Sequence, residues 1–302
     1  MKDNKILFTV IVPTFNRTHM IVETINSVLV QDYPFFELII VDDGSTDNTE
    51  EIVKALRDDR IVYHKKKHEE RAVARNTGFQ MAKGDFVTLL DSDDYLYPNH
   101  LSSAESFITQ HPDAEIIRFK YDIIDKKKNS LTTANIPDSI NEAMIQGNYL
   151  GCSGILLSRN IIVNHRFNND LSLSGSEDYE LWLRLSARYP IYTSDIVTST
   201  LNAHAERSVI YNIQETSLVN RIELLIKYSF EDKEVMRIYG KQKNDFVSKC
   251  LLYVSLHLAI AQYKKSSLKY LYKALQSKPD SLFDIRVLGI LKTLLFRPEL
   301  NY

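Results

Sequence analysis

The nine residues Phe86-Val87-Thr88-Leu89-Leu90-Asp91-Ser92-Asp93-Asp94 restrict the fold more than any other stretch. An apolar run that stops at three carboxylates within four positions predicts a buried strand delivering its acids at its carboxyl end. Ligands of open α/β sheets bind at that end. Neighbouring carboxylates repel one another, so a bound divalent cation would relieve a costly arrangement. The alternative is an acidic surface turn, because so short a motif recurs by chance.

Strand and helix patterns alternate through the first part of the chain. Apolar runs suited to buried strands are separated by segments with an apolar stripe at helical spacing. This alternation predicts a mostly parallel sheet with helices on both faces. The expected elements are a strand at 6–12 ended by Pro13, a helix at 21–29, a strand at 36–41, a helix at 47–56 and a strand at 61–63.

Charged residues mark two further predicted helices. Arg71 and Arg75 are one turn apart, so their side chains lie on one face and can point together at an anion. Glu177 and Asp178 follow a Ser/Gly approach and begin a helix, where they can face a cleft. Each pair also has a plainer interpretation. The arginines can be solvated surface charges, and the acids can simply match the dipole of the helix start.

The composition is that of a globular protein of 302 residues, 44% of them hydrophobic and 25% charged. The two cysteines, Cys152 and Cys250, form no metal-ligand or disulfide pattern, which favours buried thiols in a reducing cytoplasm. The apolar start runs into Pro13 without a cleavage site, so we expect a first strand there and not a signal peptide. No apolar tract reaches the roughly 18 residues that a membrane-spanning helix requires.

The pattern changes at about Gln214 to long helices without strand signals. We therefore expect two parts, an α/β domain at 1–210 and an all-helical appendage at 211–302. The appendage has 15 Lys/Arg against 9 Asp/Glu, a net charge of +6 in a chain whose total is −2. Such a basic helical segment either braces the first domain with its charges solvated or rests on an anionic membrane surface.

Five motifs in a fixed order, covering about residues 6 to 210, together resemble the family-2 glycosyltransferases with a GT-A fold. They are Val12-Pro13-Thr14-Phe15-Asn16-Arg17, Val41-Asp42-Asp43-Gly44-Ser45-Thr46-Asp47, Ala74-Arg75-Asn76-x-Gly78, Leu90-Asp91-Ser92-Asp93-Asp94 and Glu177-Asp178-x-x-Leu181-Trp182. The resemblance implies an enzyme that moves a sugar, of hexosyl or N-acetylhexosaminyl type, from a nucleotide-sugar donor to an acceptor hydroxyl. A UDP-sugar is the expected donor, Mn²⁺ or Mg²⁺ the expected cofactor, and no nucleic-acid partner is expected.

The resemblance also implies roles for individual residues. Asp178 matches the catalytic base, with Glu177 beside it, and one base without a nucleophilic carboxylate implies inversion of configuration. Asp94 is expected to organise the loop. The donor would contact Pro13, Thr14, Phe15, Asn16, Arg17, Asp43, Arg75, Asp91 and Ser92. The metal would contact Asp93, Asp91 and His204, although a lone histidine such as His204 can equally be structural.

The family pattern leaves open the path of one loop and the identity of the arginine that contacts the diphosphate. Glu69-Glu70-Arg71 stands where many members have a glycine, so either Arg71 or Arg75 can be the arginine that meets the diphosphate. The implied setting is bacterial surface-polysaccharide assembly, with a saccharide or lipid-linked saccharide acceptor at the inner face of the cell membrane.

Three other functions are weighed against transfer. A sugar-nucleotide pyrophosphorylase lacks support because its Gly-rich N-terminal signature is absent, and a dinucleotide oxidoreductase because no G-x-G-x-x-G follows the first strand. A non-catalytic sugar-nucleotide binder or scaffold, attached through the helical tail to a polysaccharide assembly complex, stays open. The intact Asp91, Asp93 and Asp178 favour the enzyme.

Overall fold

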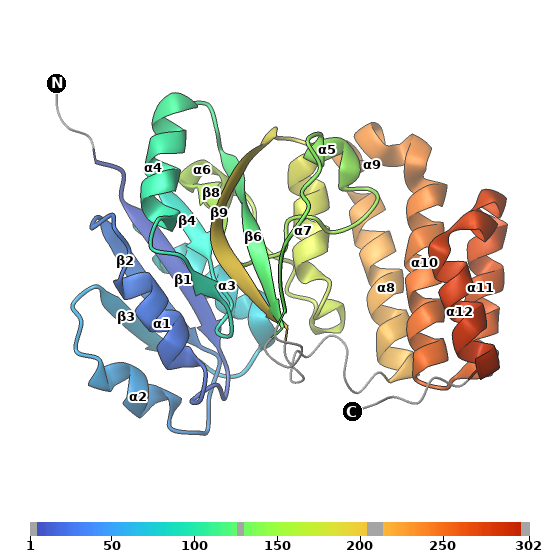
Figure 1. The fold of residues 1–302 in the computed structure, drawn as a ribbon, viewed down its shortest axis with the longest axis horizontal. Coiled ribbons are helices and arrows are strands. Elements are labelled where there is room, and N and C mark those ends of the chain that lie inside the picture. The colour runs from blue at the N-terminus through green and yellow to red at the C-terminus, as the bar shows by residue number, and fades with distance from the viewer. Residues whose placement is uncertain (1–4, 126–129, 204–213, 297–302) are drawn as a thin grey trace.

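The computed structural model describes residues 5–125, 130–203 and 214–296. Within these residues a nine-stranded mixed sheet is flanked by helices, and a group of helices from the end of the chain packs at one side (Figure 1). The main path of the sheet runs β3-β2-β1-β4-β8-β6-β9-β5, and β7 pairs with β6. The α/β class expected from the sequence is confirmed.

Four strands near the N-terminus form the parallel part of the sheet. They are β1 (Phe8–Thr14), β2 (Phe36–Asp42), β3 (Ile61–Lys65) and β4 (Phe86–Leu89). Their register aligns Ile11 of β1 with Ile39 of β2 and Leu89 of β4. The loops after these three strands therefore leave the sheet at the same edge.

Pro13 lies inside β1, so the expectation that it ends this strand is wrong. β4 pairs with β1 only as far as Leu89 opposite Ile11, whereas β2 continues along β1 to Asp42 opposite Thr14. At Pro13 one edge of β1 therefore has no ladder partner. A residue without a backbone N–H is tolerated at such a position.

The second part of the sheet combines both strand directions. β8 (Ile155–Ser158) pairs antiparallel with β4 and with β6 (Ile116–Asp125), and β6 runs parallel to β9 (Ile191–Ala203). The short strands β5 (Tyr95–Leu96) and β7 (Ser130–Thr133) complete it. Pairing of β5 with β9 places the loop after β4 beside the end of β9.

Both faces of the central strands are buried, each against different helices. Val10 and Val12 of β1 face a hydrophobic cluster with α1 (Ile21–Leu29) and α4 (His100–Gln110). Ile11 faces the opposite cluster, which includes α3 (Glu70–Met81) and α7 (Glu177–Ser186). The shorter helices are α2 (Thr49–Ala55), α5 (Ile140–Ala143) and α6 (Arg159–Asn164).

A glycine allows α3 to approach β1 closely. A Cβ at Gly78 would lie 2.5 Å from Cγ2 of Ile11, a separation that real Cβ atoms essentially never show. Close packing of α3 matters because this helix carries Arg71 and Arg75 toward the carboxyl edge of the sheet.

The C-terminal helices pack against α7 and share its hydrophobic core. They are α8 (Glu215–Glu231), α9 (Lys233–Tyr239), α10 (Lys243–Ile260), α11 (Lys264–Ser277) and α12 (Ile285–Phe296). One cluster of buried residues runs from Trp182 in α7 through Leu225 and Phe246 to Ile290. None of the described helices combines the length and apolar character needed to cross a membrane.

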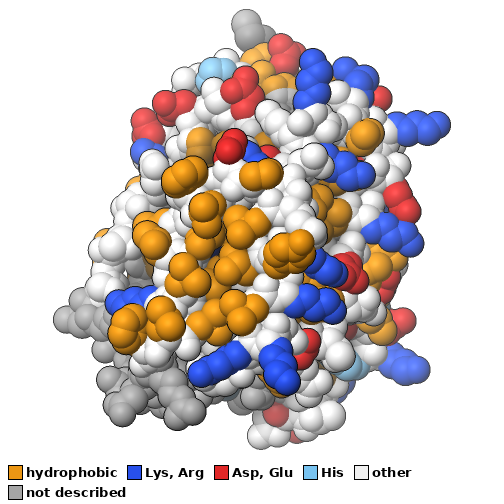
Figure 2. Space-filling model, turned by 90° about the vertical axis from the view of Figure 1, so that its right-hand side faces the viewer, with side chains coloured by type: hydrophobic (Ala, Val, Ile, Leu, Met, Phe, Trp, Pro, Cys, Tyr) orange, Lys and Arg blue, Asp and Glu red, His pale blue; other side chains and the backbone are white. Residues whose placement is uncertain are grey.

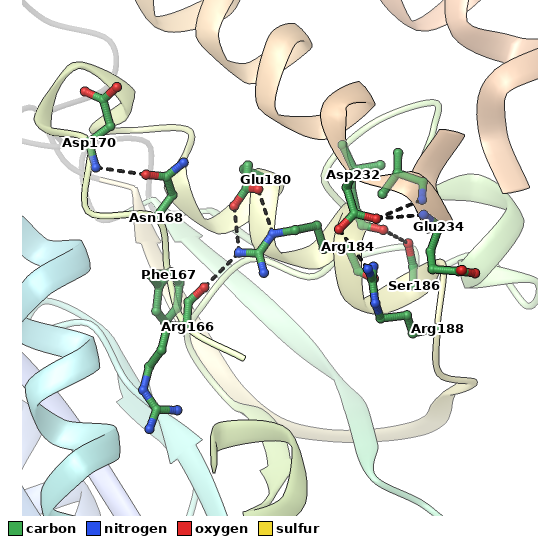
Figure 3. A network of polar contacts seen from close by, with 12 residues as sticks. Arg166, Phe167, Asn168, Asp170, Glu180, Arg184, Ser186, Arg188, Asp232 and Glu234 are labelled. Atoms are coloured by element: carbon green, nitrogen blue, oxygen red, sulfur yellow. Dashed lines mark hydrogen bonds and ion pairs between the residues drawn. The ribbon is translucent and has the colours of Figure 1, made fainter. Parts of the chain in front are cut away.

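Polar contacts hold α7 to the segment before it and connect its end to the start of α9, as Figure 3 shows. Nε and Nη2 of Arg184 donate to the Glu180 carboxylate at 2.6 and 2.8 Å, and Nη2 also donates to the carbonyl of Arg166 at 2.8 Å. Arg188 pairs with Asp232 at 2.8 Å, and Asp232 caps α9 through its other carboxylate oxygen. The helix that begins with Glu177 and Asp178 is thus held along its length.

Candidate active site

A cavity of about 470 Å³ opens where the loops after β1, β2 and β4 meet α3 and the start of α7. Segments far apart in the sequence contribute to its wall. Of the residues implied by the family resemblance, the wall includes Pro13, Thr14, Phe15, Arg17, Asp43, Arg75, Asp91, Ser92, Asp93, Glu177 and Asp178.

Two expected residues do not belong to this described wall. Asn16 joins the loops after β1 and β2: its N–H donates to Oγ of Ser45, and its Oδ1 accepts the N–H of Thr46, both at 2.8 Å. Asn16 adopts φ 51°, which an asparagine tolerates better than most residues. His204 lies outside the described residues.

Asp43 is a buried carboxylate at one end of the cavity. Its Oδ1 accepts from Nζ of Lys66 at 2.8 Å and from the N–H of Glu69 at 3.0 Å. Nδ1 of His68 lies 2.8 Å from Oδ2, and the His68 ring stacks on Phe15 with centroids 4.2 Å apart. An aromatic pair thus lies beside a fixed carboxylate, an arrangement that suits a nucleobase.

Arg75 lies at the centre of the wall and is only 2% exposed. Its Nη2 donates to Oδ1 of Asp91 and its Nη1 to Oε1 of Glu177, both at 2.8 Å. Burial opposes its charge, yet the acidic groups of Cys152, Asp91 and Glu177 hold the pKa of Arg75 well above its ordinary value. The guanidinium is therefore a permanent cation inside the site.

Arg71 lies one turn before Arg75 and faces the same cavity, as the spacing of the two residues predicts. Its side chain is 34% exposed, and its Nε lies 3.9 Å from Oε1 of Glu177. The two arginines thus differ. Arg75 is enclosed between two carboxylates, whereas Arg71 is the more accessible cation.

Asp91, Asp93 and Asp94 place one ligand atom each within 4.8 Å of one another. Asp94 is fully buried; its Oδ1 accepts the N–H of Asn202 at 2.8 Å and its Oδ2 the hydroxyl of Ser153 at 2.5 Å. These bonds of Asp94 hold the loop in place, and all three acids line the cavity. Carboxylate oxygens are the ligands that Mg²⁺ and Mn²⁺ prefer, so this donor set fits either ion.

The two acids at the start of α7 have different surroundings. Glu177 is buried, bound to Arg75 through Oε1 and to the N–H of Gly175 through Oε2 at 2.5 Å. Asp178 accepts from the N–H of Tyr179 at 2.7 Å and from Nδ2 of Asn148 at 2.9 Å. Burial raises the pKa of Asp178 to about 6, and the charge of Glu177 adds to this rise. A carboxylate with that pKa can accept a proton near neutral pH.

Asn76, the last residue of the motif Ala74-Arg75-Asn76, binds the backbone of the segment before α7. Its Oδ1 accepts the N–H of Phe167, and its Nδ2 donates to the carbonyl of Phe167, both at 2.9 Å. These bonds fix the segment that leads to α7, which positions Glu177 and Asp178 relative to α3.

A second cavity of about 240 Å³ adjoins the first and shares Gly175 and Asp178 with it. Residues of the α/β part, at 145–148 and 175–179, and residues of the C-terminal helices line it together. Its apolar wall includes Ile145, Tyr179, Ile222, Leu225, Phe246 and Tyr253. Asp178 thus lies between a larger cavity lined by many charged residues and a smaller cavity with a mainly apolar wall.

Several residues that shape the site have no local signal in the sequence. Asn148, Ser153 and Asn202 belong to segments without a motif, and each reaches an acid only through the fold. The expectation of buried thiols is confirmed for both cysteines. The sequence does not show, however, that Cys152 lines the larger cavity and Cys250 the smaller one.

The mixed α/β sheet, with a cavity at the carboxyl ends of its strands, agrees with the GT-A fold that the sequence resemblance implies. The family model for Glycosyl transferase family 2 matches residues 9–161, about half of the chain. The chain belongs to this family.

Similar proteins agree with this assignment. WfaP of Escherichia coli, a UDP-Glc:alpha-D-GlcNAc-diphosphoundecaprenol beta-1,3-glucosyltransferase, is 32% identical over 66% of this chain and 78% of its own. The matched segment spans about a third or less of the length of the relatives from Rickettsia conorii, Rickettsia felis and Rickettsia bellii.

Two solved structures share the fold. The S. aureus TarS fragment 1–349 in complex with UDP-GlcNAc has a TM-score of 0.63 at 18% identity, covering 91% of this chain and 92% of that one. The mannosyltransferase PcManGT of Pyrobaculum calidifontis, in complex with GDP-Man and Mn²⁺, has a TM-score of 0.55 at 16% identity, covering 98% and 89%.

Proposed function

We propose that this chain is an inverting, metal-dependent glycosyltransferase that transfers a hexosyl or N-acetylhexosaminyl group from a UDP-sugar to an acceptor hydroxyl. One observation carries the proposal: Asp178, whose pKa is about 6, lines the same cavity as Asp91 and Asp93. A proton acceptor and a cluster able to hold a cation are the two groups that this transfer needs. The activity in the name of WfaP and the ligand in the TarS structure support the choice of a UDP-sugar.

The donor nucleotide would lie along the loops after β1 and β2. The uracil would stack near Phe15 and donate its N–H to Asp43. Oγ1 of Thr14 is buried without a hydrogen-bond partner among the described residues, and Thr14 lines the cavity, so a bound nucleotide would supply one. Arg17 and Ser92 extend the same wall toward the diphosphate.

The diphosphate would lie between the acidic cluster and the arginines of α3. Asp93 and Asp91 would hold Mn²⁺ or Mg²⁺, which when bound supplies electrostatic stabilisation of the leaving group. Arg71 would contact the diphosphate directly, because it is the more accessible of the two arginines. Arg75 fixes Asp91 and Glu177 and adds its permanent charge.

Transfer would then proceed by direct displacement. Asp178 takes the proton of the acceptor hydroxyl as its oxygen attacks the anomeric carbon, and the bond to the nucleoside diphosphate breaks on the opposite side. Both carboxylate oxygens of Glu177 are bonded within the protein, to Arg75 and to Gly175. A second carboxylate nucleophile, which retention by double displacement would need, is therefore not offered at this position.

The acceptor would enter through the smaller cavity. This cavity ends at Asp178, and its apolar wall from α8 and α10 suits the apolar face of a sugar ring. We propose a saccharide acceptor carried on a lipid, met at the cytoplasmic face of the cell membrane. This choice is supported by the lipid-linked acceptor in the name of WfaP. In this proposal residues 1–210 form the catalytic domain and 211–302 the helical region that completes the acceptor site.

Release of nucleoside diphosphate tests the proposal. The full chain is incubated with Mn²⁺ and with UDP-Glc, UDP-GlcNAc, UDP-Gal, GDP-Man or dTDP-Glc in turn. We expect turnover with at least one UDP-sugar, and loss of turnover in Asp178→Asn but not in the matched control Asp195→Asn, an exposed acid of β9 that does not line the cavity. Absence of turnover with every donor, while UDP still binds, would instead identify a non-catalytic binder.

A further inference from the structure

The outer side of the last two helices exposes a continuous set of large apolar side chains. Among them, Phe283 is 88% exposed and Ile285 is 81% exposed. Figure 2 shows hydrophobic side chains gathered over this side of the molecule, with charged side chains of both signs around them. We call this surface the tail face; it comprises Tyr263, Leu268, Tyr272, Leu282, Phe283, Ile285, Leu288, Leu291, Leu295 and Phe296.

The tail face is not the ordinary exposed edge of a core helix. α12 buries Val287 and Ile290 against α10, so this side of the helix already contributes to the hydrophobic core. On the opposite side Ile285, Leu288 and Leu295 form a second apolar stripe. Single exposed hydrophobic residues are common, but a contiguous patch marks a surface that binds something.

The charge around the tail face is mostly positive, although Asp280 and Asp284 lie between its two helices. α11 and α12 contain six basic residues and neither Asp nor Glu: Lys264, Lys265, Lys269, Lys273, Arg286 and Lys292. Asp284, between the helices, is paired with Arg286 at 2.7 Å. Exposed lysines beside apolar side chains are the composition of helices that lie in the interface of an anionic bilayer.

We propose that the tail face binds the surface of an anionic lipid bilayer. The apolar side chains enter the boundary between headgroups and acyl chains, and the lysines contact the anionic headgroups. α12, with 12 residues, lies along the surface and does not cross it. A second copy of the chain is a poorer partner, because self-association would bring two sets of lysines together.

This inference gives the proposed membrane location a defined surface. α10 lines the smaller cavity with Phe246 and Tyr253 and packs against α11 and α12. Docking of the tail face would therefore bring the cavity proposed for the acceptor toward the membrane that carries a lipid-linked acceptor. Vesicle binding is measured without turnover, so its failure would leave the catalytic proposal standing, and the reverse also holds.

Co-sedimentation of the full chain with vesicles tests the proposal. Vesicles of phosphatidylcholine alone are compared with vesicles that contain 30% phosphatidylglycerol, at low salt and at ~0.5 M salt. We expect binding to the anionic vesicles, weakened by salt. Each lysine near the surface is worth about fivefold in affinity, so Lys264→Glu/Lys265→Glu should lower binding by about 25-fold or more.

Matched variants separate the surface from general effects of mutation. Phe283→Ser/Ile285→Ser should lower binding at least tenfold, whereas Val163→Ser, at a residue of α6 that is 61% exposed, should not. Lys54→Glu/Lys83→Glu, at two exposed residues away from the tail face, controls for the change in net charge. Circular dichroism checks that each variant is folded.

Two results would overturn the proposal. The first is equal sedimentation with neutral and anionic vesicles at low salt, or none with either. The second is light scattering that shows a dimer which Phe283→Ser/Ile285→Ser converts to a monomer, without vesicle binding by the wild type. The tail face would then be an interface between two copies of the chain.

Discussion

Nη1 of Arg75 donates to Oε1 of Glu177 at 2.8 Å, although 102 residues separate the two in the chain. Both side chains are almost completely buried. This pair joins α3 to the start of α7 and so sets the position of Asp178, the neighbour of Glu177. A buried ion pair is costly to break, because the remaining charge is left without compensation.

We therefore expect Arg75→Ala to destabilise the fold by about 3–5 kcal/mol, since Asp91 and Glu177 both lose their cation. Arg71→Ala, at the more exposed arginine, should cost at most about 1 kcal/mol while weakening donor binding. Urea denaturation measures the first effect and calorimetry with UDP the second. Equal stability losses in the two variants would contradict the different roles assigned to them.

The raised pKa of Asp178 predicts how activity depends on pH. Only the ionised carboxylate accepts a proton, so kcat/KM should fall as the pH drops through about 6. Asn148→Ala removes a hydrogen bond to the ionised form and should move this midpoint upward. A profile of kcat/KM from pH 4.5 to 9 measures this midpoint. If kcat/KM does not fall on the acid side, Asp178 is excluded as the titrating base.

The same pKa has a consequence for stability. Asp178 binds its proton more tightly in the folded chain than in the unfolded one. The protonated side chain therefore adds to the free energy of unfolding at low pH, and this contribution is lost as the pH rises through about 6. Asp178→Asn does not titrate. Its free energy of unfolding relative to wild type should therefore rise between pH 4.5 and pH 8 by about 1–3 kcal/mol, measured by urea denaturation. No change in this difference would contradict the raised pKa.

Removal of the metal should weaken binding of the donor. We expect EDTA or Asp93→Ala to raise the Kd for a UDP-sugar at least tenfold, and Asp91→Ala to have a smaller effect, by calorimetry. Asp59→Ala, at an exposed acid just before β3, serves as the control. An unchanged Kd after chelation would remove the metal from the proposed mechanism.

Gly78 should tolerate no larger side chain. Alanine at a helix position normally gains about 1 kcal/mol over glycine, but here its Cβ would lie 2.5 Å from Ile11. Overpacking of this kind costs about 1–3 kcal/mol, so Gly78→Ala should be less stable than wild type on balance. In Gly147→Ala the nearest atom is 3.7 Å away, and thermal unfolding should show little change. A Gly78→Ala variant more stable than wild type would contradict the close contact of α3 and β1.

Asp232 should matter more than its ion-pair partner Arg188. Oδ1 of Asp232 accepts from the N–H groups of Glu234 and Val235 at 2.9 and 3.1 Å, which caps α9 (Figure 3). Asp232→Ala should therefore cost about 1–2 kcal/mol, and Arg188→Ala no more than about 1 kcal/mol. Chemical denaturation of both variants tests this order, and the reverse order would show that the ion pair outweighs the cap.

Much of the fold follows from local patterns. The apolar runs at 6–12, 36–41 and 86–90 are long and bounded by acids or proline, so their strands could be predicted from composition and spacing alone. Side chains one turn apart share a helix face whatever the tertiary structure, which is why Arg71 and Arg75 were expected to point together. The end of β1 was predicted wrongly, because tolerance of Pro13 depends on where β4 stops pairing.

The sequence by itself determined which residues stand at strand ends and helix starts: Asp43, Asp91, Asp93, Glu177 and Asp178. Tertiary structure alone decided what each of them does there. It enclosed Glu177 with Arg75, tied Asp94 to Asn202, and left Asp178 between two cavities with a raised pKa. The physical reason is that charge burial and hydrogen-bond partners depend on distances across the fold, and no period in the sequence encodes those distances.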